Sequence, residues 1–270
     1  MNFRLPDGFD MTHWAARWER MQERYLARRE ERFAVIADII AATQASPRLI
    51  IDIGCGPGSL ALRLLRAFEG ATVVGVDFDP ALLLLARERS KEFGPRARWI
   101  ETDLREEAWL SQVNERCEVD AAKAPGGEVS GAADAIVSAT ALHWLSAEAL
   151  EALYKRVARA LRPGGVFLNA DHAAASSQLV QALWDKQRYA AIDAVPLDEA
   201  DDWRGFWRAF NDALKFDACA LGKQMRGDME GVEEGMPLQW HFEKLAAAGF
   251  HHQDCLWRLG GDAVYGAIRP

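Results

Sequence analysis

Leu49-Ile-Ile-Asp-Ile-Gly-Cys-Gly-Pro-Gly58 is the segment that decides the fold. Its short β-branched run, stopped by glycine, predicts a buried parallel strand that enters a tight turn. Each glycine removes a Cβ where the backbone must turn sharply or approach a ligand. Apolar residues recur at helical spacing from Ser59 to Phe68. We therefore expect the N–H groups of the loop and the positive end of a helix dipole to face a ligand.

Features around this loop bear on the kind of ligand. A second apolar run ends in Asp77, close to the ~20-residue offset at which an acid binds ribose hydroxyls in dinucleotide folds. The glycines fall as Gly-x-Gly-x-Gly, whereas the Gly-x-Gly-x-x-Gly pattern brings backbone against a pyrophosphate. Asp52 would repel a diphosphate and attract an ammonium group. A ligand with a ribose, an amino-acid end and no phosphate fits better, and S-adenosylmethionine is such a ligand.

Five ordered motifs resemble those of the class I S-adenosylmethionine-dependent methyltransferases, and they span roughly Ile50 to Ala170. The motifs are Ile51–Gly58, Val74–Pro80, Trp99–Asp103, Ala133–Trp144 and Leu161–Phe167. The resemblance implies that Asp77 binds the ribose, that Phe78 and Leu104 flank the adenine, and that Asp103 caps its amino group. The other residues implied at the cofactor, around its methionine end, are Asp52, Gly54, Cys55, Gly56, Gly58, Ser138 and Ala139.

Regular alternation of strand and helix patterns indicates parallel strands with right-handed crossovers and helices on both faces. We predict an α/β fold with a doubly wound Rossmann-like sheet. The resemblance implies seven strands, with the last one antiparallel between its neighbours, and Gly260-Gly261 is a hairpin signal before it. The predicted strands are 49–53, 72–76, 97–100, 134–138, 165–170, 252–258 and 262–268.

The whole chain, 1–270, is predicted to be one domain with helical additions. One long or two shorter amphipathic helices are expected between Thr12 and Thr43. The alternation breaks after Ala170, and the segment that follows is interpreted as a substrate lid over the carboxyl edge of the sheet. The predicted parts are a cap (1–46), a cofactor-binding core (47–170), a lid (171–238) and a C-terminal helix and hairpin (239–270). The other predicted helices are 58–67, 80–92, 105–115, 146–160, 178–192, 203–216 and 238–248.

Composition excludes several classes of function. A net charge of −8 disfavours a nucleic-acid binder, which displays a basic face. The arginines from Arg20 to Arg32 interleave with glutamates, so we interpret them as a solvated helix face. Neither a signal peptide nor an apolar run of ~18 residues is present, so no membrane span is expected. The scattered cysteines favour a reducing cytoplasm. We expect a cytoplasmic monomer or homodimer.

Methyl transfer from a sulfonium is a displacement in which proximity and alignment supply most of the catalysis. A base is needed only if the acceptor arrives protonated. His143 follows the fourth strand, where the resemblance places residues beside the donor methyl, and it is the first candidate base. The pair Asp171-His172, just past the fifth strand, supplies the second. The alternative roles are packing for His143 and a strand-end cap for His172. No residues have metal-ligand spacing, so no metal is expected.

Aromatic residues dominate the expected acceptor site. Trp144 is interpreted as a pocket wall, and Trp14 and Tyr25 of the cap are candidates for contact with cofactor or substrate. In the lid, Trp203 and Trp207 are expected to sandwich a flat or apolar acceptor, with Arg204 or Arg208 taking an anionic group. The alternative is that these aromatic residues only pack the cap and the lid against the core.

The sequence thus predicts an S-adenosylmethionine-dependent methyltransferase with a small-molecule acceptor, and three alternatives stay open. One is a protein that binds S-adenosylmethionine without methyl transfer, because displacement needs no signature residue. An NAD-dependent oxidoreductase is disfavoured by Asp52 and by the glycine spacing. A macromolecule methyltransferase is disfavoured by the acidic balance and by Ser138-Ala-Thr-Ala141, which stands in place of an Asn-Pro-Pro-Tyr amino-methylation motif.

Overall fold

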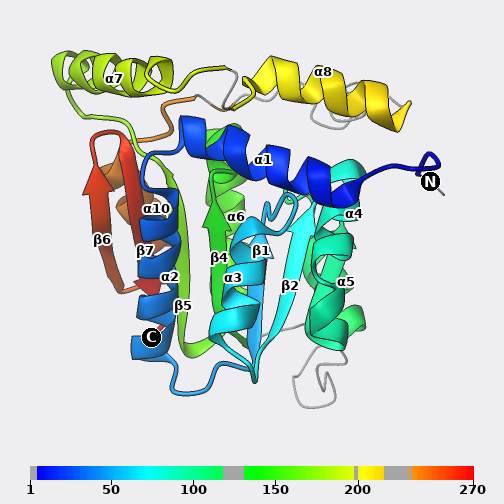
Figure 1. Cartoon of the computed structure of the whole chain (residues 1–270). Coiled ribbons are helices and arrows are strands. Elements are labelled where there is room, and N and C mark those ends of the chain that lie inside the picture. The colour runs from blue at the N-terminus through cyan, green and yellow to red at the C-terminus, as the bar shows by residue number, and fades with distance from the viewer. Residues whose placement is uncertain (1–4, 118–130, 198–199, 216–230, 232) are drawn as a thin grey trace.

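Seven strands form one mixed sheet in the order β3-β2-β1-β4-β5-β7-β6 (Figure 1). The structure is a computed structural model and describes residues 5–117, 131–197, 200–215, 231 and 233–270. β1 pairs in parallel with β2 and β4, β2 with β3, and β4 with β5. The strands are β1 (Leu49–Ile53), β2 (Thr72–Asp77), β3 (Ala97–Glu101), β4 (Ala133–Ala139), β5 (Leu161–His172), β6 (His252–Leu259) and β7 (Asp262–Ile268).

The last strand runs antiparallel, as the sequence predicts. β7 lies between β5 and β6 and pairs antiparallel with both of them. Gly260 and Gly261 make the turn between β6 and β7, and Gly260 has a φ of +58°, a conformation that glycine adopts without a steric penalty. The prediction of a doubly wound seven-stranded sheet with an antiparallel last strand is therefore confirmed.

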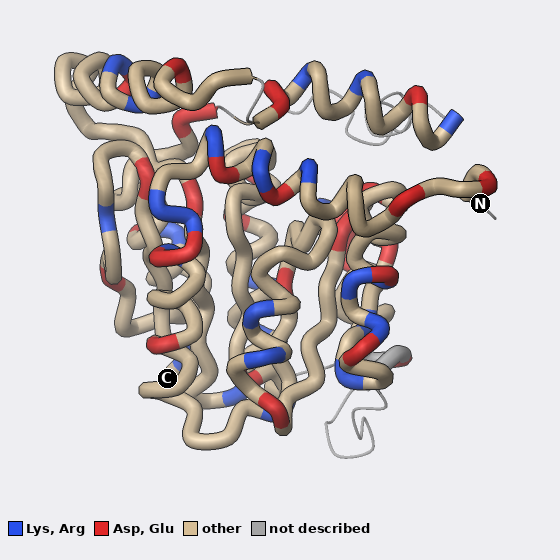
Figure 2. The backbone as a smooth tube through the Cα atoms, viewed as in Figure 1, with Lys and Arg blue, Asp and Glu red and all other residues tan. Residues whose placement is uncertain are grey.

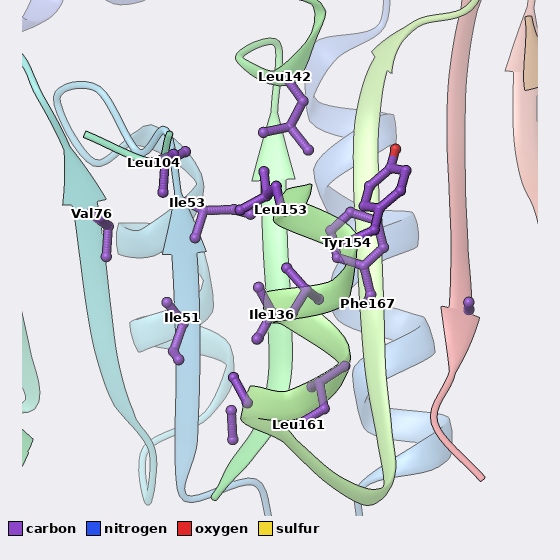
Figure 3. Packing of buried hydrophobic residues seen from close by; sticks show 14 of the residues in the cluster. Ile51, Ile53, Val76, Leu104, Ile136, Leu142, Leu153, Tyr154, Leu161 and Phe167 are labelled. Atoms are coloured by element: carbon purple, nitrogen blue, oxygen red, sulfur yellow. The ribbon is translucent and has the colours of Figure 1, made fainter. Parts of the chain in front are cut away.

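Helices cover both faces of this sheet. One core cluster packs α5, α6 and α10 against one face, and a second packs α2, α3 and α4 against the other. Figure 3 shows the first cluster, in which Leu153 and Tyr154 of α6 lie over Ile136 and Phe167. The helices are α1 (Met11–Tyr25), α2 (Arg29–Thr43), α3 (Ser59–Ala67), α4 (Pro80–Arg89), η1 (Lys91–Arg96), α5 (Ala108–Cys117), η3 (Leu142–Trp144), α6 (Ala147–Ala160), α7 (Gln178–Asp193), α8 (Trp203–Leu214) and α10 (Leu238–Ala247).

The side chains of β1 alternate between the two clusters. Ile51 and Ile53 belong to the first cluster, and Ile50 belongs to the second. The strand period of two therefore puts Asp52 on the face covered by α3, where its carboxylate accepts the N–H of Ala61 at 3.1 Å. The alternation of side chains along β1 therefore places the carboxylate of Asp52 at the first turn of α3, the helix after the glycine-rich loop.

Three helices, α1, α7 and α8, lie across the carboxyl ends of the parallel strands (Figure 1). An aromatic cluster joins α1 to α8 and rests on α4, while no side chain of α7 is buried. Its aromatic members are Trp14, Trp18, Phe206, Trp207 and Phe210. Within the described parts of the chain, none of the helices is long and apolar enough to cross a membrane.

Several element boundaries differ from the prediction, among them those of α4 and β5. α4 ends at Arg89 and not at residue 92, because a 3-10 turn, η1, follows it. β5 begins earlier and ends later than predicted, since Leu161 and Val166 both pair with β4 on either side of an irregularity. Asp171 and His172 are consequently the last residues of β5. They belong to the sheet and not to the helical segment after it.

The packing beneath the glycine-rich loop yields a stability prediction. A Cβ on Gly75 would lie 2.8 Å from the Sγ of Cys55 and closer still to the indole of Trp99. Gly75→Ala should therefore lower the free energy of unfolding by about 1–3 kcal/mol, as overpacking does. Urea denaturation followed by circular dichroism measures this change. Gly70→Ala is the matched control, because a Cβ there meets nothing within 4 Å. Equal stability of the two variants would contradict the prediction.

Candidate active site

A cavity of about 640 Å³ lies at the carboxyl ends of the parallel strands. Its volume falls within the range of small-molecule and cofactor sites. Most of the residues that the sequence suggests for the cofactor, the acceptor or catalysis line this cavity. They are Tyr25, Asp52, Gly54, Cys55, Gly56, Asp77, Phe78, Asp103, Leu104, Ala139, His143, Trp144, His172 and Trp207.

Four of the suggested residues lie outside the cavity wall. They are Trp14, Gly58, Ser138 and Arg204. The hydroxyl of Ser138 is buried and donates to the carbonyl of Ile53 at 2.7 Å. Gly58 has a φ of +78° before α3, and a Cβ on it would lie 2.6 Å from the Trp99 ring. Trp14 packs in the aromatic cluster, and Arg204 is exposed on α8.

The backbone of the glycine-rich loop is tied to the end of β2. The N–H groups of Gly54 and Cys55 donate to the carbonyl of Val76 at 2.8 and 3.1 Å. The N–H of Gly56 donates to Oδ2 of Asp77 at 2.7 Å. These three groups have acceptors inside the protein, so the expectation that the loop presents them to a ligand is wrong. Because its amides are occupied in this way, the loop does not form a phosphate cradle.

Asp52 reaches the cavity from beneath this loop. Only 1% of its surface is exposed. Burial, opposed by the hydrogen bond from Ala61 and reinforced by the charge of Asp77, raises the pKa of Asp52 to about 8. A cation bound nearby favours the ionised form of a buried carboxyl. The site is therefore suited to an ammonium group.

Further acids make this end of the cavity electronegative. Asp77, Asp79 and Asp103 all line the cavity with Asp52. Asp79 also caps α4, because its Oδ1 accepts the N–H of Ala81 at 2.9 Å. Asp103 forms an ion pair with Arg105 of 2.6 Å, and the Arg105 side chain is 40% exposed.

His143 is held by a buried carboxylate. Its Nδ1 lies 2.6 Å from Oδ1 of Asp171, and its backbone N–H donates to Oδ2 of the same residue at 3.1 Å. Although burial would raise it, the charge and hydrogen bond of His143 hold the pKa of Asp171 well below its usual range. An ionised Asp171 favours the tautomer in which Nδ1 carries the proton, and Nε2 is then an acceptor.

A second histidine–aspartate pair lies beside the first. Nδ1 of His172 is 2.8 Å from Oδ1 of Asp262, and Arg32 lies 3.4 Å from that same oxygen. The rings of His143 and His172 are 5.0 Å apart, and both residues line the cavity. The β5–β7 pairing creates this arrangement, since His172 and Asp262 are opposite each other in the ladder.

Arginines of α2 and α7 approach the cavity from the side of β5 and β7. Arg29 and Arg188 line it, and Arg29 is 5% exposed. Arg32, one turn further along α2, is 1% exposed. The interpretation of residues 20–32 as a solvated face is therefore wrong for these two positions. α2 packs against α3, β5 and β7, so this face of the helix is turned inward.

Glu19 is the common ion-pair partner of the arginines nearest the glycine-rich loop. It forms ion pairs with Arg29, Arg63 and Arg89, and it accepts a hydrogen bond from Ser59 at 2.6 Å. Burial would raise the pKa of Glu19, but Arg29 and Arg89 lower it to about 2. One carboxylate thus serves three guanidinium groups, and the cluster keeps an excess of positive charge.

The aromatic wall of the cavity comes from the cap, from η3 and from α8. Trp144, Trp203 and Trp207 line it together with Tyr25. The hydroxyl of Tyr25 accepts the backbone N–H of Trp203 at 3.1 Å. Trp207 also packs on Trp18 in the aromatic cluster. One face of α8 therefore both anchors the helix and closes the cavity.

Some of these residues escaped the sequence analysis. Arg29 and Arg188 were not singled out for the site, and Asp171 was singled out only together with its neighbour His172. β4 and β5 are neighbouring parallel strands, so residues after one and at the end of the other meet at the same edge. That rule could have paired His143 with Asp171. In the described residues, no group of three or more histidines, cysteines and acids is positioned to hold a metal ion.

Comparisons with known proteins address the family. Residues 51–167 match the family model described as "Methyltransferase domain". This match covers 117 of the 270 residues, and it supports the resemblance to class I S-adenosylmethionine-dependent methyltransferases. It is 33% identical over 117 residues to a trans-aconitate 2-methyltransferase of Paracidovorax citrulli, covering 43% of this chain and 36% of that protein. It is 32% identical over 143 residues to the trans-aconitate 2-methyltransferase of Delftia acidovorans, and the match covers 53% of this chain and 45% of that protein.

The solved structures agree on the fold. An O-methyltransferase family protein from Burkholderia thailandensis superposes with a TM-score of 0.54 at 18% identity, covering 96% of this chain and 69% of that one. The chain matches less than half of the length of these two trans-aconitate 2-methyltransferases, 36% and 45%. The cofactor of this methyltransferase family is S-adenosylmethionine.

The raised pKa of Asp52 predicts a pH-dependent stability in the ligand-free protein. Its pKa is about 8 in the folded chain against an ordinary value of 3.8. Between these values the folded state binds more protons than the unfolded state, so the free energy of unfolding falls as pH rises. Asp52→Asn removes this pH dependence. The free energy of unfolding of the variant, relative to that of wild type, should therefore increase steadily from pH 4 to 8.

Urea titrations at several pH values measure this difference. Glu101→Gln is the control, because Glu101 is an exposed carboxylate at the end of β3. A stability difference between Asp52→Asn and wild type that stayed constant across this pH range would mean that Asp52 titrates normally.

Proposed function

We propose that this chain transfers a methyl group from S-adenosylmethionine to a small-molecule acceptor inside the 640 Å³ cavity. The observation that carries the proposal is the continuity of that cavity. It runs from Asp52 and Asp77 at the ends of β1 and β2, and Asp103 after β3, to His143 after β4, whose ring is held by Asp171. One space therefore has room for a donor and an acceptor side by side, which a displacement reaction requires.

The donor is assigned to the acidic end. Asp77 is proposed to bind the ribose hydroxyls, with Phe78 and Leu104 against the adenine and Asp103 at its amino group. Asp52 is proposed to pair with the methionine ammonium. When bound, the sulfonium supplies an activated methyl group. The occupied amides of the glycine-rich loop support this donor over a dinucleotide, whose pyrophosphate needs free N–H groups.

His143 is proposed to contact the acceptor atom. With Nδ1 bound to Asp171, its Nε2 is an acceptor for a proton from a hydroxyl or amine that attacks the methyl carbon. Asp171 is a positioning residue, because both of its oxygens hold His143 through the ring and the backbone. His172 is proposed as a second contact in the same wall. Trp144, Trp207 and Tyr25 would enclose the acceptor.

Two other functions were considered. A protein that binds S-adenosylmethionine without transferring methyl would need no acceptor space, and the cavity beside His143 favours transfer. An NAD-dependent oxidoreductase is disfavoured by the acid at position 52. The relatives named for methylation of trans-aconitate support a small acceptor over a macromolecule.

Removal of the proposed ribose acid tests the donor site. Asp77→Ala should weaken binding of S-adenosylmethionine and S-adenosylhomocysteine by roughly tenfold or more, because a pair of charge-assisted hydrogen bonds is lost. Titration calorimetry measures both affinities, and thermal unfolding checks the fold, since Asp77 also accepts the N–H groups of Gly56 and Asp79. Glu101→Gln is the matched control, because Glu101 is an acid that lies outside the cavity. Binding of NAD in place of both ligands would overturn the proposal.

Replacement of the candidate base tests transfer itself. His143→Gln should lower kcat by about 10²- to 10⁴-fold, the usual contribution of a general base, and leave the affinity for S-adenosylhomocysteine unchanged. Asp171→Asn should reduce kcat as well, because the imidazole loses its orienting partner. An unchanged kcat in His143→Gln would contradict the assignment of a base.

A further inference from the structure

Two imidazole rings lie side by side in the wall of the main cavity. His143 follows β4 and His172 ends β5, and the carboxyl ends of these neighbouring parallel strands meet at one edge of the sheet. The ring centroids are 5.0 Å apart, and both residues line the cavity. Because β4 lies between β1 and β5, His143 is the one on the side of the proposed donor.

Each ring is bound to a carboxylate through the same nitrogen. Nδ1 of His143 lies 2.6 Å from Oδ1 of Asp171, and Nδ1 of His172 lies 2.8 Å from Oδ1 of Asp262. Burial would raise the pKa of Asp262, but the hydrogen bond of His172 and the charge of Arg32 lower it. Two ionised carboxylates favour the tautomer in which Nδ1 carries the proton, so the free lone pair of each ring is on Nε2.

The two Nε2 atoms receive no hydrogen bond from the protein. In the part of the chain that the structure describes, neither of them has a hydrogen-bond partner and neither is fully buried. The backbone of the two histidines faces the other way. A Cβ on Gly231 would lie 2.1 Å from the carbonyl oxygen of His143, and one on Gly235 would lie 2.3 Å from that of His172. These glycines line a separate cavity of about 110 Å³, so we infer that the Nε2 atoms face the larger one.

Charge alone does not select the acceptor at this end of the cavity. The helices α1, α7 and α8 above it carry positions of both signs (Figure 2). Arg188 lines this side and is paired with Glu233 at 2.9 Å. Arg29, beside the glycine-rich loop, remains available to the methionine carboxylate of the donor. Selection therefore depends on hydrogen bonds, and two lone pairs in a closed site require two donors from the ligand.

We propose that the methyl acceptor presents two neighbouring proton-bearing groups, two hydroxyls or a hydroxyl and an amine, and that His143 and His172 bind one each. This inference rests on the proposed function, because it assigns the acceptor end of the same cavity. The oxygen or nitrogen bound to His143 attacks the methyl carbon, and Nε2 takes its proton. The electron pair of the broken carbon–sulfur bond stays on sulfur, which gives S-adenosylhomocysteine. His172 holds the second group without taking its proton, so only one of the two groups is methylated.

Pairs of compounds that differ by one donor test this inference. Wild-type protein and S-adenosylmethionine are incubated with catechol or phenol, with ortho-aminophenol or aniline, and with vicinal cyclohexanediol or cyclohexanol. Trans-aconitate serves as an anion without a donor, and mass spectrometry measures the methylated products. At least one two-donor compound should be methylated, and only once. Its kcat/KM should exceed that of its one-donor partner by about tenfold or more, because the partner leaves one lone pair unbound.

Replacement of His172 shows whether this residue creates the preference. His172→Phe should lower kcat/KM for the two-donor compound to about that of its partner, and the value for the partner and the affinity for S-adenosylhomocysteine should stay roughly unchanged. His172→Gln, whose amide oxygen still accepts a hydrogen bond, should restore part of the preference. His251→Phe changes an exposed histidine and should keep all of it. The preference is a ratio within one protein, so a loss of folded protein in a variant cancels.

Several results would overturn the inference and leave the proposed function standing. These are equal kcat/KM for the two members of every pair, methylation of no two-donor compound, and a preference that survives in His172→Phe. Methylation of trans-aconitate as fast as the best two-donor compound would also overturn it. So would activity that EDTA abolishes and Zn²⁺ restores, since the two histidines would then be metal ligands. Failure of the wild type to bind S-adenosylhomocysteine would instead refute the proposed function.

Discussion

The connection between the ends of β1 and β2 determines the rest of the site. Two N–H groups of the glycine-rich loop share the carbonyl of Val76, and a third binds the carboxylate of Asp77. The loop thus has a fixed shape before any ligand arrives. It also fixes Asp77 at the cavity and leaves Asp52 beneath the loop, where burial raises its pKa. These hydrogen bonds therefore set the position of Asp77 and occupy three amides that a pyrophosphate would need.

The sequence was sufficient to predict the strands of the sheet, because the patterns that define each strand are local. Residue Ile51 faces one core cluster and Ile50 the other, as a period of two requires. The antiparallel β7 was predicted only through family resemblance and a glycine pair, since no local pattern encodes strand direction. β5 was predicted too short because Pro163-Gly164-Gly165 was interpreted as a turn before the strand, whereas the strand continues through it as an irregularity.

The polar partners of the site were harder to predict, because each pair joins distant segments. Arg29 and Arg32 have glutamates as neighbours in sequence, which is typical of a solvated helix. They are buried because α2 packs between α3 and the β5–β7 side of the sheet, where Glu19 and Asp262 meet them. His143 and Asp171 were considered separately, although β4 and β5 end at the same edge. Partners of this kind follow from strand order, which has to be known first.

The polarity of the cavity has a consequence for catalysis. When a hydroxyl is methylated, the positive charge of the sulfonium passes to the imidazole of His143 as the ether and the thioether form. The acids that hold the donor then stabilise the ground state more than the transition state, so they contribute to binding and not to kcat. The rate would have to come from proton transfer to His143 and from alignment, which the rigid loop and the walls formed by Trp144 and Trp207 supply.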